Sequence, residues 1–156
     1  MPRYEQLSSI HAFMQARMIL EHFMGREEVR SMYQARGEKH WIIPDGFIPP
    51  TSAEGSVYES HESICVLNCS SEEALLRLTI FFEDRDPLEN MLAVVPGRRT
   101  KHIRTSSLSA KGASIPLGVP YAIEVLSDVP VIVQYSRLDA TQAANALMSV
   151  MAHPIK

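Results

Sequence analysis

The hydrophobic pattern of this chain changes at Trp41, and that change restricts the possible folds more than any other feature of the sequence. After Trp41, apolar side chains recur at every second position, as they do in a strand that buries one face. The pattern is clearest in residues 75–82, where Leu76, Leu78 and Ile80 share one face. We therefore expect an all-β core from residue 41 onward.

Short strands and turn residues follow one another through the rest of this region. Their spacing leaves no room for crossover helices, so it predicts an antiparallel sandwich or barrel. Residues 64–67 are apolar on both faces, which indicates a central strand. The other predicted strands are residues 75–82, 91–95, 102–104, 121–126 and 131–138, and the predicted turns are residues 70–73, 84–87, 96–97 and 127–130.

The first forty residues predict a helical N-terminal extension, residues 1–40. A first helix carries one apolar stripe at i, i+3, i+4 spacing, Gly25 interrupts it, and residues 27–36 form a second helix that ends at Gly37. The stripe either packs on the domain or a neighbouring subunit, or it binds a partner. A third alternative is that Met24 or Met32 is the true start. The stripe consists of Leu7, Ile10, Met14 and Met18.

The end of the chain predicts a short C-terminal helix. Asp139 and Gln142 have the spacing of a capping box, and an apolar helical face follows them as far as Pro154. The sequence therefore divides into the extension and a β domain over residues 41–156 that closes with this helix. The apolar face consists of Ala143, Ala144, Leu147 and Met151.

The composition argues against some classes of function for this protein, beginning with nucleic-acid binding. A net charge of −3 over 156 residues gives no general attraction to nucleic acid or anionic lipid, so DNA binding needs a local patch. Cys65 and Cys69 are too far apart on one strand for a disulfide, and no second pair supports a zinc site. No signal peptide or membrane span is predicted. We expect a soluble cytoplasmic protein with no metal and no cofactor.

Motifs of the major enzyme classes are missing from the sequence. It has no phosphate loop, no nucleophile elbow and no two-histidine metalloprotease helix. We therefore expect a binding protein and not an enzyme, and we assign no catalytic residues. Its ligand-binding residues have to be sought among the polar and aromatic side chains.

A few side chains have a chemistry suited to ligand binding. His61 and Glu62 begin a strand and so point to opposite faces, which prevents them from holding one metal together; the simpler expectation is one solvated and one hydrogen-bonded side chain. Arg137, close to Asp139, is either part of a structural ion pair or a clamp on a polar ligand. Trp41, the only tryptophan, is either a core residue or a stacking surface for a planar ligand such as a sugar ring.

Residues 98–104 form the only dense basic cluster. On a strand, Arg99 and Lys101 face one way while His102 and Arg104 face the other, so the cluster is not one flat patch. It is either a charged edge that discourages aggregation or a contact for an anion or ligand.

Several long blocks of the sequence resemble the sensory rhodopsin transducer family, small soluble proteins named after the partner of a photosensory membrane rhodopsin. The resemblance covers nearly everything after Trp41, and the compact family members lack the first forty residues. The matching blocks are Trp41 with residues 46–50, then residues 61–68, 79–82, 96–104 and 129–139, and finally Gln142, Asn145, Ala146 and Leu147.

This resemblance implies an antiparallel β-sandwich that assembles as a homo-oligomer, typically a tetramer. It implies two kinds of function: binding of a small molecule, a sugar or related metabolite, and relay of a signal from a membrane rhodopsin by protein contact. A DNA-binding regulator that uses residues 98–104 is a third hypothesis. The candidate ligand-binding residues, chosen by chemistry and motif match, are Trp41, His61, Glu62, Asn68, Arg99, His102 and Arg137.

Overall fold

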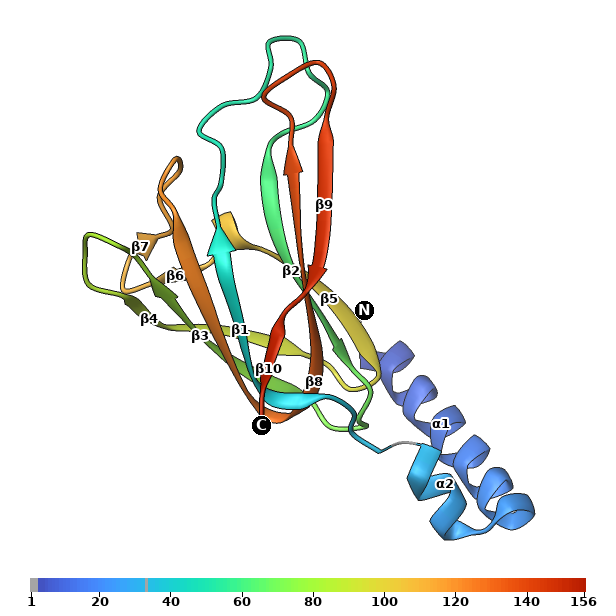
Figure 1. Cartoon of the computed structure of the whole chain (residues 1–156). Coiled ribbons are helices and arrows are strands. Elements are labelled where there is room, and N and C mark those ends of the chain that lie inside the picture. The colour runs from blue at the N-terminus through green and yellow to red at the C-terminus, as the bar shows by residue number, and fades with distance from the viewer. Residues whose placement is uncertain (1–2, 33) are drawn as a thin grey trace. The chain divides into compact units, whose positions relative to one another are not determined.

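The computed structural model describes residues 3–32 and 34–156, and the chain divides into two compact units (Figure 1). The first unit covers residues 1–34 and the second covers residues 35–156. The second unit is an antiparallel β-sandwich, which confirms the fold class predicted from the alternating pattern. Its first strand starts at Glu38, inside the segment predicted as the extension.

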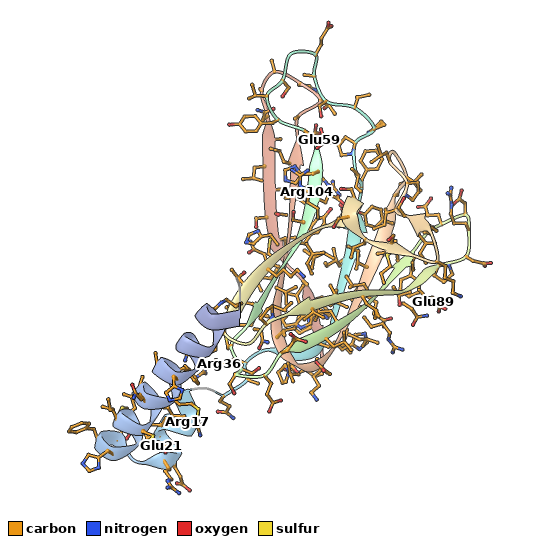
Figure 2. The ribbon with its side chains drawn as sticks, turned by 180° about the vertical axis from the view of Figure 1, so that it is seen from behind. Arg17, Glu21, Arg36, Glu59, Glu89 and Arg104 are labelled. Carbon is orange, nitrogen blue, oxygen red and sulfur yellow. The ribbon has the colours of Figure 1, made fainter. Side chains whose placement is uncertain are left out.

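The first unit is a pair of helices, α1 (Arg3–Met24) and α2 (Arg26–Met32), joined at Gly25. Gly25 has a φ of 86°, a left-handed conformation that glycine adopts without strain, and this ends α1 where the sequence predicted. An exposed ion pair joins Arg17 and Glu21, one turn apart on α1 (Figure 2). In the predicted stripe, Met14 and Met18 are more than half exposed, and the side chains of Leu7 and Ile10 lie outside the described part of the chain.

One sheet of the sandwich has the strand order β4-β3-β8-β1-β10. The predicted alternation over residues 75–82 is confirmed, because Leu76, Leu78 and Ile80 are fully buried while Leu75 and Phe81 are exposed. The strands are β1 (Glu38–Gly46), β3 (Ala74–Phe81), β4 (Leu88–Val95), β10 (His153–Ile155) and the first part of β8 (Tyr121–Asp139).

The second sheet has the order β5-β2-β8-β9. The predicted central strand is β2, which pairs with β5 on one side and with β8 on the other. Short elements follow β5 and complete the sandwich. The strands are β2 (His61–Asn68), β5 (Arg99–Arg104), β9 (Ala146–Met151) and the second part of β8, and the short elements are the 3-10 turn Thr105–Ser107 with β6 (Ser109–Ala110) and β7 (Ala113–Ser114).

Strand β8 belongs to both sheets, so the turn predicted at residues 127–130 is wrong. Residues 121–127 pair with β1 and β3, and residues 132–139 pair with β2 and β9 (Figure 1). Ser127 and Pro130 have turn chemistry, but here they mark the place where one strand changes sheets. Proline is tolerated at such an irregularity because one ladder hydrogen bond is missing there.

The predicted C-terminal helix is also wrong, because residues 146–151 form β9 and residues 153–155 form β10. Asp139 does not cap a helix: its Oδ1 accepts hydrogen bonds from the backbone N–H and the hydroxyl of Thr141, which closes a local turn. The chain then returns along β8, with Leu147 opposite Leu138. Pairing with β8 has outweighed a helical pattern that rested on only four apolar residues.

The core lies between the two sheets and takes every second side chain of each strand. Both tyrosines of β8, Tyr121 and Tyr135, point inward and are at most 4% exposed. The remaining large core side chains include Trp41, Ile43, Ile64, Val66, Leu76, Leu78, Ile80, Met91, Ile103, Ile123, Val125 and Val133.

Candidate functional site

Glu62 is the centre of a buried polar network between the two sheets. Its side chain has no exposed surface, yet four donors reach its carboxylate. The backbone N–H of Phe47 donates over 2.6 Å and Arg137 Nε over 2.8 Å, while the hydroxyls of Tyr121 and Tyr135 also donate to it. A buried carboxylate is stable only when it is satisfied in this way.

The two tyrosines are held in their neutral form by this arrangement. Burial raises the pKa of Tyr121, and the charge and hydrogen bond of Glu62 raise it further. Burial is also the largest cause that raises the pKa of Tyr135, followed by the hydrogen bond to Glu62 and then its charge, and Arg137 offsets only part of the rise. Both phenols therefore remain hydrogen-bond donors throughout the physiological range.

Arg137 connects the buried network to the surface. Burial alone lowers the pKa of Arg137, but the hydrogen bonds to Glu62 and Tyr135 outweigh that effect and raise it. The guanidinium keeps a fifth of its surface exposed, and its Nη2 lies 3.4 Å from Asp45, an exposed carboxylate at the end of β1. The predicted pairing with Asp139 is replaced by pairing with Glu62.

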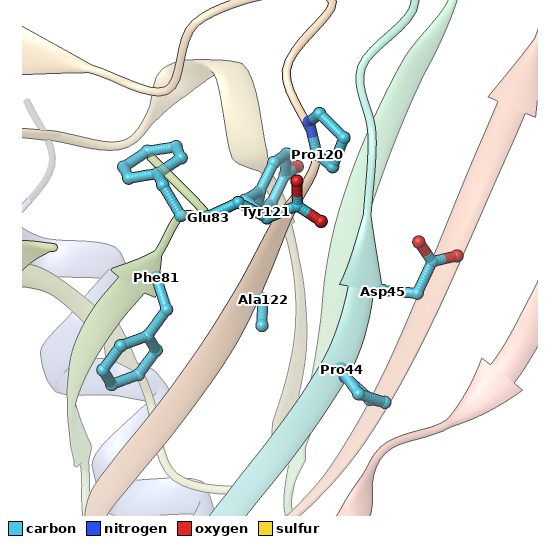
Figure 3. Close-up of a pocket in the computed structure, with 8 residues that line it drawn as sticks. Pro44, Asp45, Phe81, Glu83, Pro120, Tyr121 and Ala122 are labelled. Carbon is cyan, nitrogen blue, oxygen red and sulfur yellow. The ribbon is translucent and has the colours of Figure 1, made fainter. Parts of the chain in front are cut away.

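A groove in the first sheet lies directly beside this network, where β1 and β3 end and β8 begins (Figure 3). Phe81 and Glu83 stand on the β3 side, Pro44 and Asp45 on the β1 side, and the small Ala122 lies between them on β8. The groove has a volume of about 280 Å³. Its full lining is Pro44, Asp45, Phe81, Phe82, Glu83, Pro120, Tyr121 and Ala122.

The network determines the position of two groove residues. Tyr121 lines the groove and donates its hydroxyl to Glu62, while Asp45 lines the groove and accepts from Arg137. Gly46 makes this packing possible, because a Cβ at Gly46 would lie 2.5 Å from the ring of Tyr121. Glu62 and Arg137 therefore support the groove from behind, and neither of them lines it.

The other predicted ligand residues lie away from this groove. Trp41 is a core residue with 5% exposure, and its indole N–H donates to the backbone oxygen of Glu38 over 2.9 Å. Asn68 is fully buried and holds the turn after β2: its Nδ2 donates to the carbonyls of Glu72 and Val95, and its Oδ1 accepts from Ser70. Both have structural contacts that account for them.

The residues of the predicted basic cluster contact different groups and do not form one site. Arg99 donates to the carbonyl of Arg98, and Lys101 donates to a carbonyl of β4 over 2.9 Å. His102 lies opposite Cys65 on the outer face of the second sheet, with Nδ1 3.3 Å from the sulfur. Arg104 pairs with Glu59. His61 lines a different cleft near Arg104.

The sequence did not reveal the groove residues. Asp45 stands in a segment of turn residues, and Phe81 was assigned only as one face of a strand. No local pattern places Phe81 opposite Ala122, because the register between β3 and β8 is set by long-range strand pairing. Among the described residues, no group of three His, Cys, Asp or Glu side chains is placed to hold a metal ion.

Comparisons with known proteins find relatives of the second unit. A family model described as Anabaena sensory rhodopsin transducer matches residues 36–154. The crystal structure of Thermotoga maritima 1070 is 34% identical with a TM-score of 0.68, and covers 77% of this chain and 97% of that one. The Anabaena sensory rhodopsin transducer is 36% identical with a TM-score of 0.58, and covers 65% and 96%. No curated protein matches.

Within residues 3–32 and 34–156, no helix combines the length and the hydropathy that a membrane crossing requires.

Proposed function

Because this chain belongs to the Anabaena sensory rhodopsin transducer family, we propose that it is a signalling domain that binds a sugar-like small molecule in the groove beside Tyr121. It binds its ligand without chemical conversion and acts in the cytoplasm. The observation that carries the proposal is the groove itself, which combines exposed phenyl surface with two carboxylates on a rigid β framework.

The chemistry of the groove suits a hydroxylated ring. The phenyl ring of Phe81 is 43% exposed and offers a face on which the C–H groups of a sugar can stack. Asp45 and Glu83 provide carboxylate oxygens that accept hydrogen bonds from sugar hydroxyls. Ala122 leaves the space between these side chains open.

Calorimetry with a panel of neutral monosaccharides and disaccharides tests this function. Phe81→Ala should weaken binding about two- to tenfold, the usual contribution of one aromatic contact. Glu83→Gln should also weaken it, because an amide is a poorer acceptor than a carboxylate.

Matched controls exist for both changes. Phe23→Ala removes an exposed phenyl ring on α1, and Glu89→Gln neutralises an exposed carboxylate on β4 (Figure 2). Both should leave the affinity unchanged. No heat with any sugar, or equal affinity in Phe81→Ala and Phe23→Ala, would overturn the proposal.

A second candidate function is the relay of a signal by contact with a membrane rhodopsin. It is favoured by the 36% identity to a protein described as a sensory rhodopsin transducer. Co-purification with the retinal protein of the same genome tests it, and a genome without such a protein rules it out. DNA binding through residues 98–104 is less favoured, since their charged side chains engage separate partners; it predicts affinity that falls steeply with salt.

We also propose a homo-oligomer, with a tetramer as the expected state. The support is β9, an edge strand whose Leu147, Val150 and Met151 are at least half exposed. Light scattering coupled to size exclusion measures the assembly directly, and a monomer at all concentrations would contradict it.

A further inference from the structure

A second cleft lies at the start of β2, apart from the groove. It has a volume of about 150 Å³, roughly half that of the groove, and shares none of its lining residues. Two side chains that can carry positive charge, Arg104 and His61, line it together with the carboxylate of Glu59. Four hydroxyl side chains and four apolar side chains make up the rest of the wall, namely Thr51, Ser52, Ser60 and Ser106 with Ile48, Pro49, Pro50 and Leu117.

Hydrogen bonds fix the wall of the cleft in place. Ser60 is buried, and its hydroxyl donates to the carbonyl of Thr51 over 3.1 Å and accepts from the backbone N–H of Ala140 over 3.0 Å. Its own N–H donates to Ser52 over 2.8 Å. These bonds tie the last residue of the loop between β1 and β2 to Thr51 and Ser52 within the same loop, and to Ala140 just after β8.

Arg104 has donors to spare in this cleft. Its guanidinium carries five N–H groups, and Glu59 occupies only Nη1, over 3.2 Å (Figure 2). The side chains of Arg104 and Glu59 are 49% and 78% exposed. An exposed pair of this kind contributes little, so a ligand anion can replace Glu59 on Arg104 at small cost.

His61 adds a second recognition element of different chemistry. Its Nδ1 lies 2.8 Å from the carbonyl oxygen of Glu59, so Nδ1 carries the hydrogen and donates. In the neutral ring, Nε2 is then an acceptor and suits a ligand hydroxyl. The chemistry of Arg104 therefore suits an oxyanion, and that of His61 suits a hydroxyl group next to it.

We propose that this cleft binds a small hydroxylated anion, such as a hydroxy acid or a phosphate monoester, with Glu59 acting as an internal stand-in for the ligand's anionic group. The carboxylate and phosphate sources share one chemistry, the bidentate match to Arg104. The site is independent of the sugar groove, so the two can be tested separately.

Calorimetry or NMR titration of the full chain with gluconate, inorganic phosphate and neutral glucose tests the proposal. The two members of the ion pair give effects of opposite sign. Arg104→Gln should weaken binding of the anions about tenfold or more, because it removes a charge-assisted contact. Glu59→Gln should tighten binding about two- to fivefold, because it removes the competing carboxylate.

Arg77→Gln, on β3 and also exposed, is the matched control and should bind as the wild type does. Tighter binding of gluconate than of phosphate assigns the cleft to hydroxy acids, and the reverse assigns it to phosphate esters. Equal affinity in Arg104→Gln and Arg77→Gln would overturn the proposal, as would weaker binding in Glu59→Gln. Phe81→Ala should leave anion binding intact, so failure of the sugar groove is distinguishable from failure of this cleft.

Discussion

Two arginine–glutamate pairs bracket the start of β2, and they differ mainly in burial. Glu62 and Arg137 lie 2.8 Å apart with side chains that are 0% and 20% exposed. Glu59 and Arg104 lie 3.2 Å apart with side chains that are 78% and 49% exposed. The same chemistry therefore serves two purposes: the buried pair fixes the framework behind the groove, and the exposed pair remains exchangeable. Burial decides which pair a ligand can open.

Of the substitutions that test this comparison, Glu62→Gln should cause the largest loss in the free energy of unfolding. It leaves Arg137 and the two tyrosines around a neutral amide in a buried site, and breaking such a pair costs about 3–5 kcal/mol. We expect a loss near 3 kcal/mol in the free energy of unfolding, since Arg137 retains contact with water and with Asp45. Urea denaturation at pH 7 measures it.

A double variant, Glu62→Gln with Arg137→Gln, tests whether the loss of stability arises from leaving Arg137 without its partner. If the loss comes from an uncompensated arginine, the double variant should be more stable than Glu62→Gln alone. A Glu62→Gln protein as stable as the wild type would mean that the network does not support the fold, and the contrast between the two pairs would disappear.

The sequence predicted those parts of the fold in which burial and local pattern agree. Residues 75–82 and 64–67 became β3 and β2 because their alternation or continuous hydrophobicity reflects which faces are covered. The errors fall where local chemistry disagrees with long-range pairing. Ser127 and Pro130 mark a turn in most sequences but a change of sheet in β8, and residues 146–151 fit both a helix and a strand until β8 is there to pair with.

The candidate site was predictable only in part for the same reason. Glu62 and Arg137 were predicted as ligand-binding residues from their chemistry and from the motif match, and they lie behind the groove and do not line it. Asp45, Phe81 and Tyr121 come together only through the register of β1, β3 and β8, which no local pattern specifies. Residues that support a site can thus be recognised before those that line it.

The dependence of stability on alkaline pH tests the two tyrosines of the buried network. The pKa values of Tyr121 and Tyr135 are raised in the folded state, so their contribution to stability is complete below pH 10 and is lost as the pH rises above the unfolded-state value. Each tyrosine should lower the free energy of unfolding by up to about 1.4 kcal/mol per pH unit above pH ~10.

Tyr135→Phe isolates one of these two contributions. Its stability should fall less steeply between pH 10 and 11 than that of the wild type, by about 1 kcal/mol over that interval. Urea midpoints across pH 8–11 provide the slopes. Identical slopes in the two proteins would show that the Tyr135 hydroxyl ionises as easily in the fold as outside it.

The smallest effect is expected at the exposed pair, and it completes the comparison. Glu59→Gln makes the same chemical change as Glu62→Gln, but it should alter the free energy of unfolding by no more than about 0.5 kcal/mol, because both side chains are solvated. The same denaturation experiment measures it. A loss as large as that of Glu62→Gln would make the Glu59–Arg104 pair a structural element. Arg104 would then not be available to an incoming anion. A negligible loss of stability in Glu59→Gln, together with tighter anion binding, would show that this pair contributes to ligand recognition and not to the stability of the fold.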